Sequence, residues 1–330
     1  MSSTLERHAV AVGELLVGEG PAVVIGRRVS LRAHQGRVDA REALGERATL
    51  VEPFSAADLP IVAERADAVV VGAAWTRDIP LVQAVCGLGL PVVVERRASA
   101  SMEEWLGLAD YCAAEGDGRV ILCEGGHPDL GLMRAARAAS GRPVLVDVSR
   151  DVGLSAAAVA AGADGLIVDA GPRQESTIGT YEGAGVADPV RGAARAFVRA
   201  EDLADGLVAQ LDVGRKADAE AARRIAEEAV TIVGALLRHE APATLPECRE
   251  AIDRVDAALA TLLERRVELA GIVQRLKPVG GFAGRDAGRE RALVAEMARR
   301  APTLGEDLLA PVMNAVIEAG LHLAEQRARE

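Results

Sequence analysis

Residues 119–170 read RVILCEGGHPDLGLMRAARAASGRPVLVDVSRDVGLSAAAVAAGADGLIVDA, and this stretch decides the fold class. It contains three runs that are apolar throughout rather than alternating: RVILC at 119–123, PVLVDV at 143–148 and GLIVDA at 165–170. Such runs are typical of strands buried on both faces of a parallel sheet. Helix-length segments separate them, so the stretch predicts successive strand–helix units of a parallel α/β domain.

Four earlier runs have the same character: AVVIG at 22–26, TLVEP at 49–53, AVVVGA at 68–73 and PVVVE at 91–95. Between the runs, segments such as Asp58–Arg65 and Ser101–Glu115 carry apolar residues at helical spacing. The strand–helix repeat of about 20–25 residues predicts a TIM-like (β/α) barrel. The runs number seven rather than eight, and residues 31–48 have room for one helix at most. We therefore expect an incomplete barrel.

The segments outside these runs predict how the chain is divided. Residues 8–26 predict a short hairpin, with its turn at GEG 18–20, followed by a strand. A polar connection at 186–200 precedes one or two helices over 201–239, and the two prolines of APATLP at 241–246 break the pattern. We expect a barrel domain over residues 1–240 and a second domain over 241–330.

The second domain is predicted to be all-helical. Residues 247–277 form one long helix of about 45 Å, which Pro278 and the Gly280–Gly281 pair end. Two shorter helices follow, one from the N-cap Asp286 to about Arg300 and one from about Glu306. They are too short to cover the apolar stripe of the long helix, so a homodimer or a higher homo-oligomer is expected. The stripe consists of Ile252, Val255, Leu259, Leu262, Leu263, Leu269, Ile272, Val273 and Leu276.

Composition excludes several classes of protein. The formal net charge is −11 and only 2% of the residues are aromatic, so neither the basic surface nor the stacking side chains of a nucleic-acid binder are expected. The four cysteines, Cys86, Cys112, Cys123 and Cys248, are scattered as in a cytosolic protein with reduced thiols. No signal pattern or membrane-length apolar run occurs, which predicts a cytoplasmic location and no membrane partner.

Charged residues of the second domain fall into a pattern that predicts a binding pocket. Arg266 and Lys277 are eleven residues apart, about three turns, and therefore share one face of the long helix. The next helix begins with Asp286, Arg289 and Glu290, and an antiparallel arrangement brings all five round one pocket. Such a set suits a small dicarboxylate that also carries a hydroxyl or amino group. The alternative is that these are solvated charges on a coiled-coil dimer.

The last 80 or so residues resemble the all-helical chorismate mutase family. The pattern here is Arg249-x-x-Ile252-Asp253-x-x-Asp256, then Leu262-Leu263-x-x-Arg266, Lys277 and Asp286-x-x-Arg289-Glu290. The resemblance implies a Claisen rearrangement of chorismate to prephenate in the shikimate pathway of aromatic amino acid biosynthesis, without a cofactor or a metal. Such an isomerase positions the substrate and stabilises charge on an ether oxygen.

The family pattern also implies the role of each residue. Arg266 and Arg249 hold one carboxylate, with Arg249 contributed by the neighbouring subunit, and Arg289 helps to orient the other end of the substrate. Lys277 donates to the ether oxygen and to a carboxylate. Glu290, together with Asp286, takes the C4 hydroxyl of the ring.

The third helix departs from the family, because its usual Ser-x-x-x-Gln pair falls on Gly320 and Ala324, which we expect to line the substrate site. Loss of such a donor costs about 2–4 kcal/mol of transition-state stabilisation. One interpretation is a slow mutase in which His322, Glu325, Gln326 or a partner compensates. Another is a mutase for 4-amino-4-deoxychorismate or isochorismate, and the retained carboxylates favour a C4 hydroxyl or amine. Pyruvate elimination from isochorismate and a regulatory pseudoenzyme stay open.

Residues 14–185 resemble the barrel of 3-deoxy-D-arabino-heptulosonate 7-phosphate (DAHP) synthase, but the catalytic set is missing. The family's lysine falls on Glu95 and its phosphate-binding arginine on Gly125. The metal-ligand residues fall on Arg150, Asp169 and Gly171, and no cysteine occurs at Gly26–Arg28. A single carboxylate does not hold a divalent metal, so we expect a structural or regulatory domain without synthase activity. A small anion at Asp147, Ser149 and Arg150 stays open, whereas a metal at Cys123, Glu124 and His127 is not expected.

Overall fold

The computed structural model describes residues 8–34, 37–169, 200–238 and 242–327, and only the backbone over 200–217. The chain divides into two compact units, Met1–Ala241 and Pro242–Glu330. The predicted polar connection at 186–199 and the position of Gly171 lie outside the described residues.

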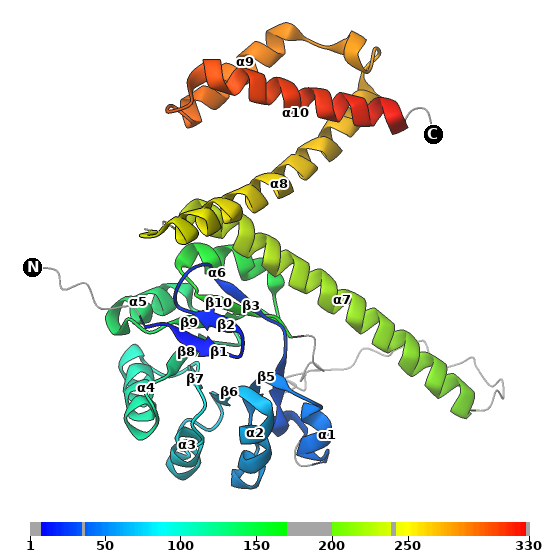
Figure 1. The fold of residues 1–330 in the computed structure, drawn as a ribbon. Coiled ribbons are helices and arrows are strands. Elements are labelled where there is room, and N and C mark those ends of the chain that lie inside the picture. The colour runs from blue at the N-terminus through cyan, green and yellow to red at the C-terminus, as the bar shows by residue number, and fades with distance from the viewer. Residues whose placement is uncertain (1–7, 35–36, 170–199, 239–241, 328–330) are drawn as a thin grey trace, which may run out of the picture. The chain divides into compact units, whose positions relative to one another are not determined.

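The first unit is built on a parallel sheet that is nearly closed into a barrel (Figure 1). The seven apolar runs predicted from the sequence form seven of its eight strands, and β4 was not predicted. From β4 to β10 each strand is hydrogen-bonded to the next in parallel register, and β10 pairs with β3. The strands are β3 (Val23–Ile25), β4 (Arg28–Ser30), β5 (Ala48–Glu52), β6 (Ala66–Val71), β7 (Val92–Glu95), β8 (Val120–Glu124), β9 (Val144–Asp147) and β10 (Gly165–Ile167).

The two edges of the sheet are joined by the chain and not by strand pairing. β3 pairs with β10 and β4 pairs with β5, while only Gly26 and Arg27 separate β3 from β4. The two edge strands of the eight-stranded sheet therefore follow each other directly in the chain, and the seven predicted runs account for every strand except β4. The described part of the connection between β4 and β5 contains η1 (Leu31–His34) and α1 (Ala40–Leu44) and no further strand.

Alternate residues of the strands separate the core into two layers. In β6, Ala68 and Val70 belong to the cluster inside the barrel, whereas Val69 and Val71 pack toward the helices. A hairpin of β1 (Val10–Val12) and β2 (Leu15–Val17) adds Val10, Val12 and Val17 to the inner cluster. The predicted turn at 18–20 is wrong, because the hairpin turns at Gly13 and Glu14, where Gly13 has a φ of 59°.

Helices cover the outer layer of the sheet (Figure 1). They are α2 (Leu59–Arg65), α3 (Ile79–Cys86), α4 (Met102–Glu115), α5 (Leu130–Ser140) and α6 (Ser155–Ala161), followed by α7 (Ala200–Leu237), which packs on α6 and β3. Helices α1, α3, α4 and α5 each begin with an N-cap residue whose side-chain oxygen accepts backbone N–H groups of the first turn. These N-cap residues are Asp39, Asp78, Ser101 and Asp129.

Three helices make up the second unit: α8 (Leu245–Leu276), α9 (Ala287–Arg300) and α10 (Gly305–Arg327). Thr244 and Glu247 form a capping box at the start of α8, which ends at Leu276 with Lys277 as its C-cap, before Pro278. Asp286 is the predicted N-cap of α9. The predicted fold, an incomplete barrel followed by three helices, is thus confirmed.

The cysteines and the lengths of the described helices bear on two smaller expectations. All four cysteines have free thiols, and Cys86, Cys112 and Cys123 are buried, but Cys248 is only half-buried on α8. Among the helices described, none combines the length and the apolar character that crossing a bilayer requires.

Candidate active site

A cavity of about 320 Å³ lies in the helical unit, walled by α8, α9, α10 and the connection between α8 and α9. Its wall has an apolar part from Leu269, Val273, Leu293, Ile317 and Leu321. The charged part consists of four cations, Arg266, Lys277, Arg285 and Arg289, and two carboxylates, Asp286 and Glu290. The wall therefore carries an excess of two positive charges, which matches the charge of a dicarboxylate.

Six of the residues predicted for the site meet in this cavity: Arg266, Lys277, Asp286, Arg289, Glu290 and Gly320. Arg249 does not line it, because 17 residues of helix separate it from Arg266, about 26 Å along α8. Ala324 does not line it either, since it lies one turn beyond Gly320 on α10. The place of Ala324 in the substrate site stays a prediction.

Lys277 ends α8 and reaches back over the connection that follows. Its Nζ donates to the backbone oxygen of Gly284 at 2.8 Å. Gly281 in the same connection has a φ of 64°, a conformation that favours glycine, and its N–H donates to Oε1 of Gln274 at 2.8 Å. These two hydrogen bonds hold the connection against the end of α8, so that Lys277 and Gln274 both line the cavity.

Arg285 was not predicted for the site, although it lies beside the motif residue Asp286. Its Nε donates to Oε1 of Glu290 at 3.0 Å and its Nη2 to Oε2 at 2.7 Å. The same guanidinium reaches Glu318 at 3.1 Å and Asn314 at 2.7 Å on α10. The hydrogen bond from Arg285 is the main cause of a lowered pKa of Glu290, which keeps this carboxylate ionised.

Asp286, Arg266 and Arg289 differ in the hydrogen bonds that they make within the protein. Oδ1 of Asp286 accepts the backbone N–H groups of Gly288 and Arg289, each at 3.0 Å, and these bonds lower its pKa. Arg266 donates from Nη1 to the backbone oxygen of Val316 at 3.3 Å. The guanidinium of Arg289 makes no hydrogen bond or ion pair within the described part of the chain, so it is available to an anion in the cavity.

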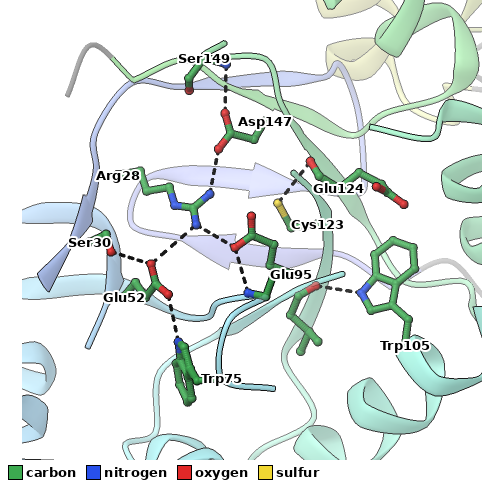
Figure 2. Close-up of polar contacts among 12 residues, drawn as sticks. Arg28, Ser30, Glu52, Trp75, Glu95, Trp105, Cys123, Glu124, Asp147 and Ser149 are labelled. Atoms are coloured by element: carbon green, nitrogen blue, oxygen red, sulfur yellow. Dashed lines mark hydrogen bonds and ion pairs between the residues drawn. The ribbon is translucent and has the colours of Figure 1, made fainter. Parts of the chain in front are cut away.

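The carboxyl ends of the barrel strands present a different kind of charge cluster (Figure 2). Nη1 of Arg28 donates to Oδ2 of Asp147 at 2.8 Å and Nη2 to Oε2 of Glu95 at 2.9 Å, while Glu52 lies 3.9 Å away. All four side chains are mostly buried, with 9–16% of their surface exposed. Burial lowers the pKa of Arg28, but the negative charges of Glu95 and the other neighbours raise this pKa by more, so the net shift is upward.

Further hydrogen bonds occupy the carboxylates of this cluster. Glu52 accepts from Oγ of Ser30 at 2.7 Å and from Nε1 of Trp75 at 3.0 Å (Figure 2). Asp147, one of the residues considered for an anion site, also accepts the N–H of Ser149 at 3.0 Å. The four charges of the cluster sum to −2, which is the opposite of what a phosphate site needs.

The acidic and thiol side chains at the carboxyl ends of the described strands do not fit a metal ion. Glu95, Glu52 and Asp147 are bound to an internal arginine, and the buried Glu124 pairs with Arg96. Burial raises the pKa of the Cys123 thiol well above its usual range. Among the residues that the structure describes, no three histidine, cysteine or acidic side chains are grouped to hold a metal.

Comparison with protein families confirms the two predicted resemblances in the predicted order. Residues 248–325 match the family model described as chorismate mutase type II, and residues 35–178 match the DAHP synthetase I family. A curated phospho-2-dehydro-3-deoxyheptonate aldolase of Thermotoga maritima is 33% identical over an alignment of 146 positions that covers 39% of this chain. The match spans 43% of that relative's own length.

Two solved structures from Thermotoga maritima are similar to part of the chain. The first, phospho-2-dehydro-3-deoxyheptonate aldolase, is 27% identical with a TM-score of 0.44 and covers 50% of this chain and 64% of its own. The second, a truncated form of 3-deoxy-D-arabino-heptulosonate 7-phosphate synthase, is 26% identical with a TM-score of 0.42. The match covers 52% of this chain and 84% of the chain of that structure.

Proposed function

We propose that the helical unit, which carries the chorismate mutase type II match, rearranges chorismate to prephenate. The observation that carries this proposal is the cavity with four cations and two carboxylates from three helices. Its excess of two positive charges complements a dicarboxylate, while Asp286 and Glu290 supply acceptors for a ring hydroxyl or amine.

The reaction is intramolecular and balances without a cofactor. The ether C–O bond breaks, a C–C bond forms between the enolpyruvyl arm and the ring, and no proton or electron leaves the molecule. The protein therefore has to hold the arm over the ring and to stabilise the negative charge that develops on the ether oxygen. Arg266 and Arg289 hold the carboxylates, Lys277 donates to the ether oxygen, and the ionised Glu290 accepts from the C4 hydroxyl.

We propose that the site is completed by a second copy of the chain, which contributes Arg249. Two observations support this. Arg249 lies too far along α8 to line the cavity of its own unit. The same half of α8 also carries exposed apolar side chains, with Ile252, Val255, Leu259 and Leu262 each at least 50% exposed. Burying such a stripe against a second copy stabilises a dimer by about 25 cal/mol for each Å² of apolar surface removed from water.

A mutase for a chorismate analogue is the second candidate. It is favoured by Gly320, which lines the cavity where the family has a polar side chain and leaves that part of the wall without a hydrogen-bonding group. The retained Asp286 and Glu290 accept from a C4 amine as well as from a C4 hydroxyl. 4-Amino-4-deoxychorismate is therefore a better alternative than isochorismate.

For the barrel we propose a structural or regulatory role without synthase activity. The buried ion cluster supports this, because Arg28 fills the centre of the strand ends and its partners leave a negative charge there. A sugar phosphate would meet repulsion from Glu95 at the position of the family's lysine. Measurable condensation of phosphoenolpyruvate with erythrose 4-phosphate by the purified chain would contradict this proposal.

The test is a parallel turnover assay of the purified chain with chorismate, isochorismate and 4-amino-4-deoxychorismate, with products separated by chromatography. Rapid formation of prephenate supports the mutase. Selective consumption of one analogue supports the second candidate, and release of pyruvate from isochorismate identifies a lyase. No turnover of any of the three overturns the enzymatic proposal in favour of a regulatory subunit.

A further inference from the structure

The cavity of the helical unit contains a neutral amide, Gln274, that no motif singles out. Gln274 lies in the last turn of α8 and Lys277, three residues later, is the C-cap, so the two side chains lie next to each other at the end of the helix. The amide is half-buried, and both residues line the cavity. A polar group beside the ammonium is therefore available at the point where the proposed reaction needs donors.

The connection after α8 determines which end of the amide is available. The backbone N–H of Gly281 donates to Oε1 of Gln274 at 2.8 Å, and because an N–H only donates, the oxygen has to face the connection. Within the residues that the structure describes, no protein group accepts a hydrogen bond from Nε2 of Gln274. Its two N–H groups are thus left to a molecule in the cavity.

The opposite wall offers no such donor. Gly320 has no side chain, and its nearest neighbour across the packed helices is Cβ of Ala270, at 3.8 Å from a Cβ built on the glycine. Lys277 already uses one of its three N–H groups on the oxygen of Gly284. The free amide of Gln274 and the ammonium of Lys277 are therefore two neighbouring donors on one helix face, directed at one cavity.

We propose that Nε2 of Gln274 donates a hydrogen bond to the ether oxygen of the bound substrate, beside the donation from Lys277. This role rests on the proposed mutase function. The amide moves no proton; it stabilises the charge that grows on the oxygen as the C–O bond breaks, and it lets α8 supply the donor that α10 lacks. Gln274 is thereby a catalytic residue in contact with the reacting atoms.

Two substitutions of Gln274 distinguish hydrogen-bond donation from Nε2 to the substrate from the bond that Oε1 accepts from the N–H of Gly281. Gln274→Met removes both the donor and the acceptor, and we expect kcat to fall about 10²-fold with little change in KM. Gln274→Glu keeps an oxygen for the N–H of Gly281 but has no donor while it is ionised. Its protonated carboxyl regains an O–H donor, so its kcat should rise as the pH falls from about 8 toward 5, unlike that of the wild type.

The matched control is Gln83→Met, the same change at an exposed glutamine of the barrel unit that bonds Glu115 at 2.9 Å. It should keep the kcat of the wild type. Thermal unfolding of each variant, followed by circular dichroism, shows whether a loss of kcat accompanies a loss of structure.

The outcomes distinguish this proposal from the one it rests on. An active wild type with unchanged kcat in both Gln274 variants overturns the role of Gln274 alone. A loss of kcat in Gln274→Met with full, pH-independent activity in Gln274→Glu shows that only the contact with Gly281 matters, which also overturns it. A wild type that turns over none of the three substrates overturns the mutase function, and the catalytic role of Gln274 with it.

Discussion

Arg285 holds both carboxylate oxygens of Glu290, through N···O distances of 3.0 and 2.7 Å, and joins the start of α9 to Asn314 and Glu318 of α10. The pair lies in the cavity wall, so Glu290 is oriented and ionised before any substrate arrives. Because the folded-state pKa of Glu290 is lowered, the stabilisation from this pair is present above its unfolded pKa of about 4.3 and is lost as the pH falls through the folded-state value.

Arg285→Met should shift the pH dependence of turnover. Without the guanidinium, the pKa of Glu290 rises, because the hydrogen bond and the positive charge that favour the ionised form are gone. The acid limb of the pH profile of kcat/KM should therefore move to higher pH, and activity at pH 5 should fall more than activity at pH 8. Arg291→Met, at an exposed arginine of the same helix, serves as the control. An acid limb at the wild-type position in Arg285→Met would contradict the role given to this pair.

Lys277→Met should lower kcat by about 10²–10³-fold, since it removes the cationic donor that we propose for the developing oxyanion. Steady-state kinetics with the preferred substrate give the measurement. Arg265→Met is the matched control, because Arg265 is exposed on α8 and pairs only with Glu268 in the described structure. Equal activity of the two variants would exclude Lys277 from the reaction.

Two inactive variants, Arg249→Ala and Lys277→Ala, should restore activity when they are combined in one heterodimer. A heterodimer of an Arg249→Ala chain and a Lys277→Ala chain has one site with both residues intact if Arg249 serves the partner's cavity. Each homodimer is then nearly inactive, and refolding an equimolar mixture restores part of the wild-type activity. If Arg249 acts in its own unit, no site in the mixture is intact and no activity returns. Sedimentation measurements show in parallel whether dimers form.

Gly320→Ala should stabilise the helical unit by about 0.5–1 kcal/mol, because alanine is the better residue inside a helix. The added methyl group meets Ala270 at 3.8 Å, an ordinary van der Waals distance. Gly305→Ala is the matched contrast, since Gly305 has a φ of 65° and alanine is strained there despite the open space. Thermal unfolding should therefore shift upward for the first variant and downward for the second. A downward shift for Gly320→Ala would show that the wall of the cavity is tighter than the described packing.

Arg28→Met should destabilise the barrel by about 3–5 kcal/mol, because Glu95 and Asp147 are left as buried carboxylates without their cation. Denaturant unfolding measures the loss, and adding Glu95→Gln to Arg28→Met should recover part of it. Arg41→Met removes an exposed pair with Glu64 and should cost less than about 1 kcal/mol. A small effect of Arg28→Met would mean that solvent or another group reaches the cluster.

Seven of the eight barrel strands could be predicted because each is a short apolar run buried on both faces, whereas β4, with the sequence RVS, carries no such signal. All seven predicted runs coincide with strands to within a few residues, and the absence of an eighth unit followed from the length of residues 31–48. The hairpin turn was misassigned because Gly13, Gly18 and Gly20 all have positive φ, so glycine content alone does not identify the turn. The pairing of Val10 with Val17 decides it.

The candidate site was predictable where its residues share one helix or follow an N-cap. The spacing of Arg266 and Lys277 is a property of α8 alone, and Asp286, Arg289 and Glu290 belong to the first turn of α9 and its N-cap. Gln274 and Arg285 were missed because their significance depends on contacts: one with the N–H of Gly281, the other with Glu290, Asn314 and Glu318. No spacing rule contains such contacts.

The sequence by itself determined the parallel barrel, its missing unit, the three helices and the helix face that carries Arg266 and Lys277, because these depend on periodicity and end signals within short segments. Only the tertiary structure decided which charges are paired. Arg28 meets Asp147 and Glu95 across 119 and 67 residues, and Arg285 meets Glu318 across 33. Such pairs exist only once strands and helices far apart in the chain have packed, because a guanidinium and a carboxylate have to come within about 3 Å to bond.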